Sequence, residues 1–215
     1  METEIEETSP IDIKILLRIV LKTVAPGFSP TNENLKFISS KLQKIHLKKG
    51  EFFIKEGQVS STVGILLNQK AVMKAYSHNE EDGEKKVTRI FYSPDNLIVS
   101  SFESFKERTP TTENIVAVTN DVLILAINYD DLQQIYKEIP SFNAIGRILA
   151  EQSYITVLRK YREMQSYSGK KRVECFCSHS KWLTNIVDAQ DIASYLGLSR
   201  NKYADLLKEI NRVGG

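Results

Sequence analysis

Cysteine and histidine are scarce in this chain of 215 residues, which has two cysteines, Cys175 and Cys177, and three histidines, His46, His78 and His179. Two thiolates cannot fill a tetrahedral metal site, and the histidines are scattered along the chain. We therefore expect no metal site, no catalytic centre and no cofactor. Cys175 and Cys177 are interpreted as structural residues on one side of a strand.

Long apolar runs are also absent. No stretch approaches the ~20 apolar residues of a membrane span, so no membrane partner is expected. The first seven residues are acidic and lack the positive segment that opens a secretory signal peptide. Together with the low cysteine content, this indicates the reducing cytoplasm.

Net charge is small, at +2, but it is unevenly distributed. Residues 1–140 carry 17 basic and 20 acidic side chains, a net of −3, whereas residues 141–215 carry 12 and 7, a net of +5. A mildly acidic N-terminal part and a basic C-terminal part indicate two modules, the second suited to binding a polyanion. A chance fluctuation in charge explains the same numbers. Hydrophobic residues at 41% exclude a disordered or fibrous chain.

Short β-prone runs recur about every ten residues between Ile45 and Ile127, separated by Gly, Asn, Asp and Pro turn signals. This spacing predicts an antiparallel barrel or jelly roll of eight strands. The runs are Ile45–Leu47, Phe52–Ile54, Gly64–Leu67, Ala71–Tyr76, Val87–Tyr92, Leu97–Val99, Ile115–Val118 and Val122–Ile127.

Helical periodicity flanks these strands and makes the expected fold class α+β. One helix is predicted over residues 11–24, and a second, capped by Ser29 or Thr31, reaches about Leu42. A short helix is predicted over Asp130–Glu138 and a long one over residues 141–166. A polar segment, Ser166–Arg172, is interpreted as a hinge.

The long helix carries a narrow seam at spacings of three and four. Its residues are Ile145, Ile148, Gln152, Ile155, Arg159 and Arg162, with Leu149 and Leu158 beside them. Such a seam indicates contact with a second helix across a homodimer. Packing of the helix against its own barrel explains the seam equally well.

The segment Asp188–Ile210 has the sequence pattern of a helix-turn-helix. Asp188 is predicted to cap the first helix, with Asp191 in its first turn, and Ser199 to cap the second. Gly197 supplies the positive φ of the turn. The small residue Ala193 allows the second helix to cross closely, and the small core between the helices is expected from Ile192, Leu196, Leu198, Tyr203 and Leu206.

A helix-turn-helix that reads DNA places its second helix in the major groove, N-terminus first. Arg200 can pair with guanine and Asn201 with adenine, while Lys202, Lys208 and Ser199 suit phosphates. Asp205 either accepts from cytosine or lies outside the contact. Lys170, Lys171 and Arg172 add sequence-independent attraction. The candidate DNA contacts are Ser199, Arg200, Asn201, Lys202, Ala204, Asp205 and Lys208.

The order of these parts resembles the cyclic-AMP receptor protein / FNR family of bacterial transcription regulators. The most specific matches are Leu47–Gly57, at the start of the barrel, and Ile192–Arg200, in the helix-turn-helix Asp188–Ile210, which we call the reader. The resemblance implies a double-stranded β-helix (jelly-roll) sensor over residues 1–140, a dimerisation helix over residues 141–166 and a winged helix-turn-helix over residues 167–215. Oxygen-sensing relatives need several cysteines, which this chain lacks.

The sequence departs from the relatives that bind cyclic nucleotides. They carry Gly-Glu-Leu and then Arg-Ser/Thr-Ala, whose Glu holds the ribose and whose Arg holds the cyclic phosphate. Here Ser101 stands at the Glu position, Thr111 and Thr112 stand at Arg-Ser/Thr, and Glu113 replaces Ala. Without the arginine, the phosphate loses its bidentate partner, so ordinary cyclic-nucleotide binding is not expected.

A gapped register would instead place Glu103 at the ribose and Arg108 at the phosphate. The alternative, which we favour, is a capping box of Ser100 and Glu103 on a short helix, with Arg108 on the surface. Candidate residues of an effector pocket are therefore Ser100, Ser101, Glu103, Arg108, Thr111 and Thr112.

The sequence thus favours a homodimeric, sequence-specific regulator that binds double-stranded DNA, with an unknown small molecule as its effector or none. Two other classes stay open. One is a ligand-binding or protein-interaction module whose helix-turn-helix only packs, to which Asp205 and the five residues after Ile210 lend support. The other is a cupin-like enzyme, which would need a bound transition metal.

Overall fold

The computed structural model describes residues 12–79, 85–93 and 98–213. Eight antiparallel strands form two four-stranded sheets, with the orders β1-β8-β3-β6 and β2-β7-β4-β5. Each of the eight expected runs overlaps one strand, with Leu97 outside the described residues, so the predicted barrel is confirmed. The strands are β1 (Gln43–Leu47), β2 (Phe52–Ile54), β3 (Thr62–Leu66), β4 (Met73–His78), β5 (Lys86–Tyr92), β6 (Ile98–Val99), β7 (Asn114–Ala117) and β8 (Val122–Asn128).

Alternating apolar residues hold the two sheets together. Along β8, Val122, Ile124 and Ala126 alternate on the inward face and are fully buried, while Leu125 and Ile127 on the other face are also buried. Ile124 lies opposite Ile45 of β1 and shares a buried cluster with Met73 of the other sheet. Burial of these side chains supplies the main stabilisation of the barrel.

The helices also follow the sequence pattern. Thr31, not Ser29, caps α2, since its hydroxyl accepts a hydrogen bond from the Asn34 amide at 3.1 Å. The helices are α1 (Ile13–Val24), α2 (Asn32–Lys41), α3 (Phe102–Glu107), α4 (Tyr129–Glu138), η1 (Pro140–Phe142), α5 (Asn143–Ser166), α6 (Gly169–Ser180), η2 (Lys181–Asn185), α7 (Ala189–Tyr195) and α8 (Arg200–Val213).

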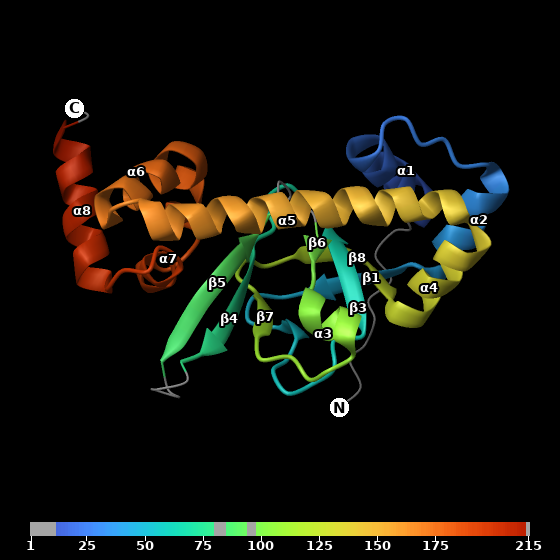
Figure 1. The fold of residues 1–215 in the computed structure, drawn as a ribbon, viewed down its shortest axis with the longest axis horizontal. Helices are drawn as coiled ribbons and strands as arrows, with labels where there is room; N and C mark the ends of the chain where they lie inside the picture. The colour runs from blue at the N-terminus through green and yellow to red at the C-terminus, as the bar shows by residue number, and fades with distance from the viewer. Residues whose placement is uncertain (1–11, 80–84, 94–97, 214–215) are drawn as a thin grey trace.

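The long helix α5 runs along the molecule from one end to the other (Figure 1). The barrel lies beside its middle, α1, α2 and α4 gather at its N-terminal end, and α6, α7 and α8 gather at its C-terminal end. The expected hinge is shorter than predicted. α5 ends at Ser166 and α6 begins at Gly169, so only Tyr167 and Ser168 separate the two helices, and Ser168 caps α6.

Three buried clusters correspond to these parts. One fills the barrel, and a second joins α1, α2, α4 and the start of α5. The third fills the C-terminal helices and also includes Val72 and Phe91 of the barrel. The C-terminal helices are therefore packed onto the barrel as well as tethered to it.

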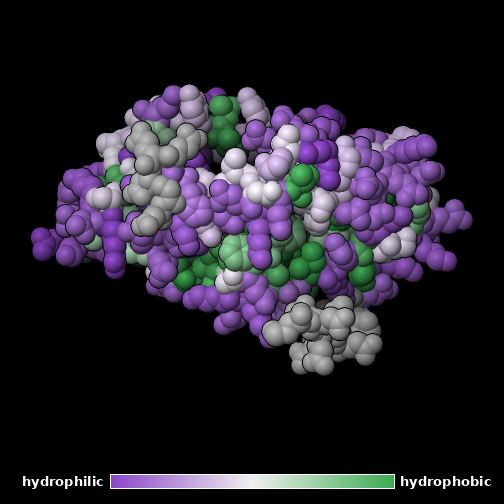
Figure 2. Space-filling view, turned by 90° about the horizontal axis from the view of Figure 1, so that it is seen from below, coloured by the Kyte–Doolittle hydropathy of each residue, from purple (hydrophilic) through white to green (hydrophobic). Residues whose placement is uncertain are grey.

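The face seen from the barrel side is mainly hydrophilic, with apolar atoms visible between polar side chains near its middle (Figure 2). Exposed apolar side chains of the barrel include Phe52, Val59 and Phe102. None of the described helices combines the length and apolar character that a bilayer crossing requires.

Candidate nucleic-acid interface and sensor pocket

The turn between α7 and α8 is built as the sequence predicts. Gly197 has φ +66°, and the Leu198 amide donates to the Ala193 carbonyl at 2.9 Å. The Ser199 hydroxyl accepts from the Lys202 amide at 3.2 Å and caps α8. Asp188 occupies the cap position of α7, but its side chain makes no capping hydrogen bond, so that part of the expectation was wrong.

The two helices enclose the expected small core. Ile192, Ala193, Leu196, Tyr203 and Leu206 are buried, and Leu198 is half-buried against them. Because these side chains face inward, α7 and α8 form one packed unit. The opposite face of α8 is left to solvent.

The candidate DNA contacts lie on that solvent face. Ala204 is half-buried, and the other six are exposed, namely Ser199, Arg200, Asn201, Lys202, Asp205 and Lys208. Figure 1 shows α8 at one end of the molecule, apart from the strands of the barrel. The structure therefore brings the residues together on an accessible helix whose first turn is free to approach a ligand.

The basic run before the reader, Lys170–Arg172, is less available for contacts with DNA than the sequence suggests. The Lys170 ammonium lies 2.5 Å from the Glu209 carboxylate of α8, and Lys171 lies 3.6 Å from Glu174. The hydrogen bond between Lys170 and Glu209 raises the pKa of the lysine and lowers that of the glutamate. Arg172 donates to the Met164 carbonyl at 3.2 Å. These contacts join α6 to α8 and to the end of α5.

Two further expectations for this segment need correction. The described residues 167–213 contain helices and no strand, so they form no wing. Cys175 and Cys177 lie in α6 rather than on a strand. Burial raises the pKa of the Cys177 thiol, although Lys181 acts in the opposite direction. The described residues gather no three His, Cys, Asp or Glu side chains into a group that could hold a metal ion.

The long helix exposes apolar side chains on two sides: Ile155 of the predicted seam is 45% exposed, and a second group lies away from that seam. The N-terminal part of that seam, Ile145 and Ile148, packs within the protein's own α-helical cluster. Tyr154, Val157 and Tyr161 are 67%, 57% and 57% exposed. Their spacings of three and four place them on one stripe, roughly opposite the predicted seam at ~100° per residue. Packing within the chain therefore accounts only for the start of the predicted seam, because Gln152, Ile155, Arg159 and Arg162 farther along it are exposed.

The expected capping box of α3 is not formed. The cap residue is Ser101, without a side-chain capping bond, and the Ser100 hydroxyl is buried without a hydrogen-bond partner among the described residues. Glu103 is exposed. Ser101 instead shares a hydrogen bond of 2.7 Å with Thr111 inside the barrel. The structure thus joins Ser101 and Thr111, while Thr112 is exposed.

Arg108 is on the surface, as favoured from the sequence. It ends α3 with φ 60°, donates to the Ser60 carbonyl at 2.8 Å and lies 4.7 Å from the centroid of the Tyr129 ring. Its guanidinium is engaged by these groups rather than by Thr111. The gapped register, in which Arg108 would hold a phosphate, gains no support from this placement.

Glu113 is the residue that most affects which ligands the candidate pocket can accept. Burial raises the pKa of its carboxyl, and nearby Glu103 acts in the same direction, while the Ser101 hydroxyl and Arg89 lower it. Glu113 also contributes to the raised pKa of the buried Tyr92 phenol. A carboxylate beside Ser101 repels an anion at the position that the family resemblance assigns to a cyclic phosphate.

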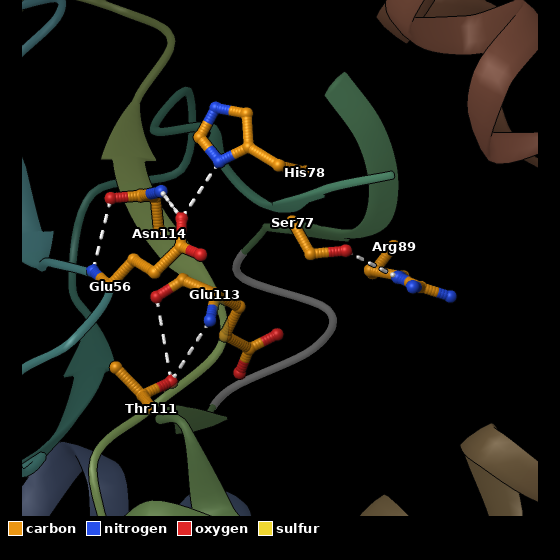
Figure 3. A network of polar contacts seen from close by, with 7 residues as sticks. All are labelled: Glu56, Ser77, His78, Arg89, Thr111, Glu113 and Asn114. Atoms are coloured by element: carbon orange, nitrogen blue, oxygen red, sulfur yellow. Dashed lines mark hydrogen bonds and ion pairs between the residues drawn. The ribbon is translucent and has the colours of Figure 1, made fainter. Parts of the chain in front are cut away.

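A polar network next to Glu113 was not found from the sequence (Figure 3). The Glu56 carboxylate lies 2.8 Å from the His78 ring and accepts from the Asn114 amide group at 3.1 Å. Arg89 donates to the Ser77 hydroxyl at 3.0 Å. The β4–β5 register shifts between Ala75 and Tyr76. No sequence signal located this irregularity, at which the register skips Arg89.

Comparisons with known proteins identify the fold. No protein-family model and no curated protein match the sequence. The global regulator CLP of Xanthomonas campestris has a similar structure, with a TM-score of 0.64 and 13% identity over 86% of this chain and 93% of that one. FixK2 of Bradyrhizobium japonicum gives 0.64 and 12% over 80% and 86%. A Eubacterium rectale protein described as a transcriptional regulator of the crp/fnr family gives 0.64 and 18% over 86% and 85%. The chain therefore has the fold of these regulators.

Proposed function

We propose that this chain is a sequence-specific DNA-binding transcription regulator of the cyclic-AMP receptor protein / FNR type. The observation that carries the proposal is the exposed first turn of α8, where Arg200 and Asn201 follow the Ser199 cap on a helix backed by its own core. Both side chains suit bidentate contacts with purine edges in the major groove. The fold of the solved neighbours supports the same conclusion.

The proposed functional unit is a homodimer joined along α5. Tyr154, Val157 and Tyr161 offer an apolar stripe that no described part of the same chain covers. A second copy of α5 would bury this stripe as a two-stranded helical contact. The paired readers would then meet half-sites about one helical turn apart on a palindromic site.

An effector, where one exists, would act by favouring one arrangement of the two readers through α5 and the short Tyr167–Ser168 connection. Glu113 beside Ser101 argues against an anionic cyclic phosphate in the usual position. The proposed regulator is therefore one whose barrel does not bind cyclic nucleotide in the way of its relatives.

Selection of bound sequences from a random duplex pool tests this function. The full chain is used without effector, with cyclic AMP and with cyclic di-GMP, because the solved neighbour CLP is described as responsive to the latter. We expect a palindromic consensus that cyclic AMP does not change. An Arg200→Ala, Asn201→Ala double variant is the control and should enrich no consensus. Failure to retain any duplex at low salt would favour a protein-interaction module, to which the exposed Asp205 carboxylate is better suited.

A further inference from the structure

The reader covers an edge of the sensor barrel. β5 is the outermost strand of its sheet, and α7 lies along it. The Phe91 ring of β5 lies 5.1 Å from the Tyr195 ring of α7, and Phe91 belongs to the same buried cluster as Ile192. An outer strand leaves unpaired backbone groups that another element must satisfy or cover. Here the covering element is the first helix of the DNA reader.

Polar contacts fix the position of α7 on this edge. The Asp191 carboxylate lies 2.5 Å from the Lys74 ammonium of β4 and accepts from the Thr88 hydroxyl of β5 at 3.0 Å. The Thr88 backbone amide donates to the Ser194 hydroxyl at 3.0 Å. One carboxylate thus bridges both strands of the β4–β5 hairpin, and a second hydrogen bond lies one turn further along α7.

These contacts are shielded from water. The Lys74 and Asp191 side chains are only 20% and 17% exposed. A carboxylate and an ammonium at such a depth depend on each other, because removal of one leaves the other charge uncompensated. Apolar packing alone would permit α7 to slide along β5, whereas the pair and the Thr88 bonds define one register.

We propose that Asp191 is a positioning residue that locks the reader onto the β4–β5 hairpin and so sets the orientation of α8 directly from the barrel. The inference rests on the proposed function and adds a second path to it, independent of the α5 connection. α7 and α8 share a core, so a helix fixed at Asp191 fixes the recognition helix too. In a dimer, two locked readers keep a constant separation, and this raises the effective concentration of the second reader at its half-site.

The test compares Asp191→Asn with Asp188→Asn in the full chain. Both substitutions remove one carboxylate charge near the start of α7, but Asp188 is exposed and makes no capping bond. Hydrogen exchange without DNA is the first measurement. Asp191→Asn should speed exchange of the Thr88 amide and of α7 by about tenfold, the size expected for one lost charge-assisted hydrogen bond, and Asp188→Asn should leave both unchanged. Equal exchange in the two variants would overturn the proposal.

A charge swap distinguishes a positioning pair from a merely structural carboxylate. Lys74→Asp combined with Asp191→Lys should restore most of the protection that either single variant loses. If the double variant recovers no protection although its unfolding midpoint equals that of Asp188→Asn, opposite charges at this contact do not hold the reader.

DNA binding supplies the second measurement. On a selected duplex with two half-sites, Asp191→Asn should weaken binding by about tenfold, while a duplex with one half-site should lose less than about twofold. Equal losses on both duplexes would contradict a role in orientation. If the wild-type chain binds no duplex, the proposed function fails, and hydrogen exchange still decides whether Asp191 locks the reader to the barrel.

Discussion

The Lys160 ammonium of α5 lies 3.6 Å from the centroid of the Tyr195 ring of α7. The long helix and the reader therefore meet at this pair, one turn along α7 from Asp191, where the Tyr195 ring also packs on Phe91 of the barrel. Burial lowers the pKa of Lys160 to about 8, with Arg172 acting in the same direction and Glu163 against it. The charge of Lys160 thus opposes folding at neutral pH, although the aromatic face partly compensates it.

Lys160→Met should change how stability depends on pH. A lysine whose pKa falls on folding carries a penalty while it is charged in both states, below about pH 8, and loses that penalty as pH rises from about 8 to its ordinary value of 10.5. Wild type should gain stability over this window and Lys160→Met should not. Urea unfolding at neutral and alkaline pH measures this, with the exposed Lys36→Met as control. A variant that is less stable by the same amount at every pH would show that packing on Tyr195 dominates.

The free stripe of α5 predicts which substitutions break the dimer. Val157→Glu places a charge in the proposed apolar contact and should give monomers at micromolar concentration, because a buried unpaired carboxylate costs several kcal/mol. Ile155→Glu is the matched control, since Ile155 is 45% exposed on the other side of the helix. Sedimentation velocity compares the two. Monomers from Ile155→Glu alone would restore the originally predicted seam as the interface.

The sequence predicted α5 but not which side of it is free. Apolar spacing located Ile145 and Ile148 correctly on one stripe, yet spacing cannot tell whether the neighbour is the same chain or a second copy. The answer depends on α1, α2 and α4, which cover the start of that stripe. Tyr154, Val157 and Tyr161 have the same spacings of three and four as the predicted seam, so spacing alone cannot choose between the two stripes.

Glu113→Gln should stabilise the protein at neutral pH. A carboxyl whose pKa is raised in the folded state contributes stability only while it is protonated, and this contribution is lost as pH rises through the folded pKa. Glutamine keeps an acceptor for Ser101 without the charge. The unfolding midpoint of the variant should exceed that of wild type at neutral pH, and the gap should close toward pH 4.

Two controls accompany this prediction. Glu107→Gln, on the exposed end of α3, should shift the midpoint at neither pH. Millimolar cyclic AMP should stabilise wild type no more than adenosine does. A clear stabilisation by cyclic AMP would mean that Glu113 does not exclude the phosphate.

Local signals in the sequence located the reader and the barrel, because strand runs, turn glycines and helix caps depend on near neighbours. The contact of Asp191 with Lys74 joins residues 117 positions apart, and no local pattern announces it. Asp191 was expected only to favour the start of α7. The cap of α3 was also misjudged, since Ser100 and Glu103 have the spacing of a capping box but the helix begins one residue later.

The recognition helix itself gives the most direct prediction. Arg200→Ala and Asn201→Ala should each reduce discrimination between the selected site and a site altered at one position by about 1–3 kcal/mol, because a bidentate contact to a purine edge is lost. Lys208→Ala should instead weaken binding to all duplexes alike and lower the slope of log affinity against log salt by about one unit.

Asp205→Asn separates the two roles left open for its carboxylate. It should change discrimination only if the carboxylate accepts from a cytosine, and it should otherwise raise affinity for every duplex by removing a charge that repels phosphate. Fluorescence anisotropy over a salt series measures all four variants, and equal losses on every sequence for Arg200→Ala and Asn201→Ala would remove α8 as the reading helix.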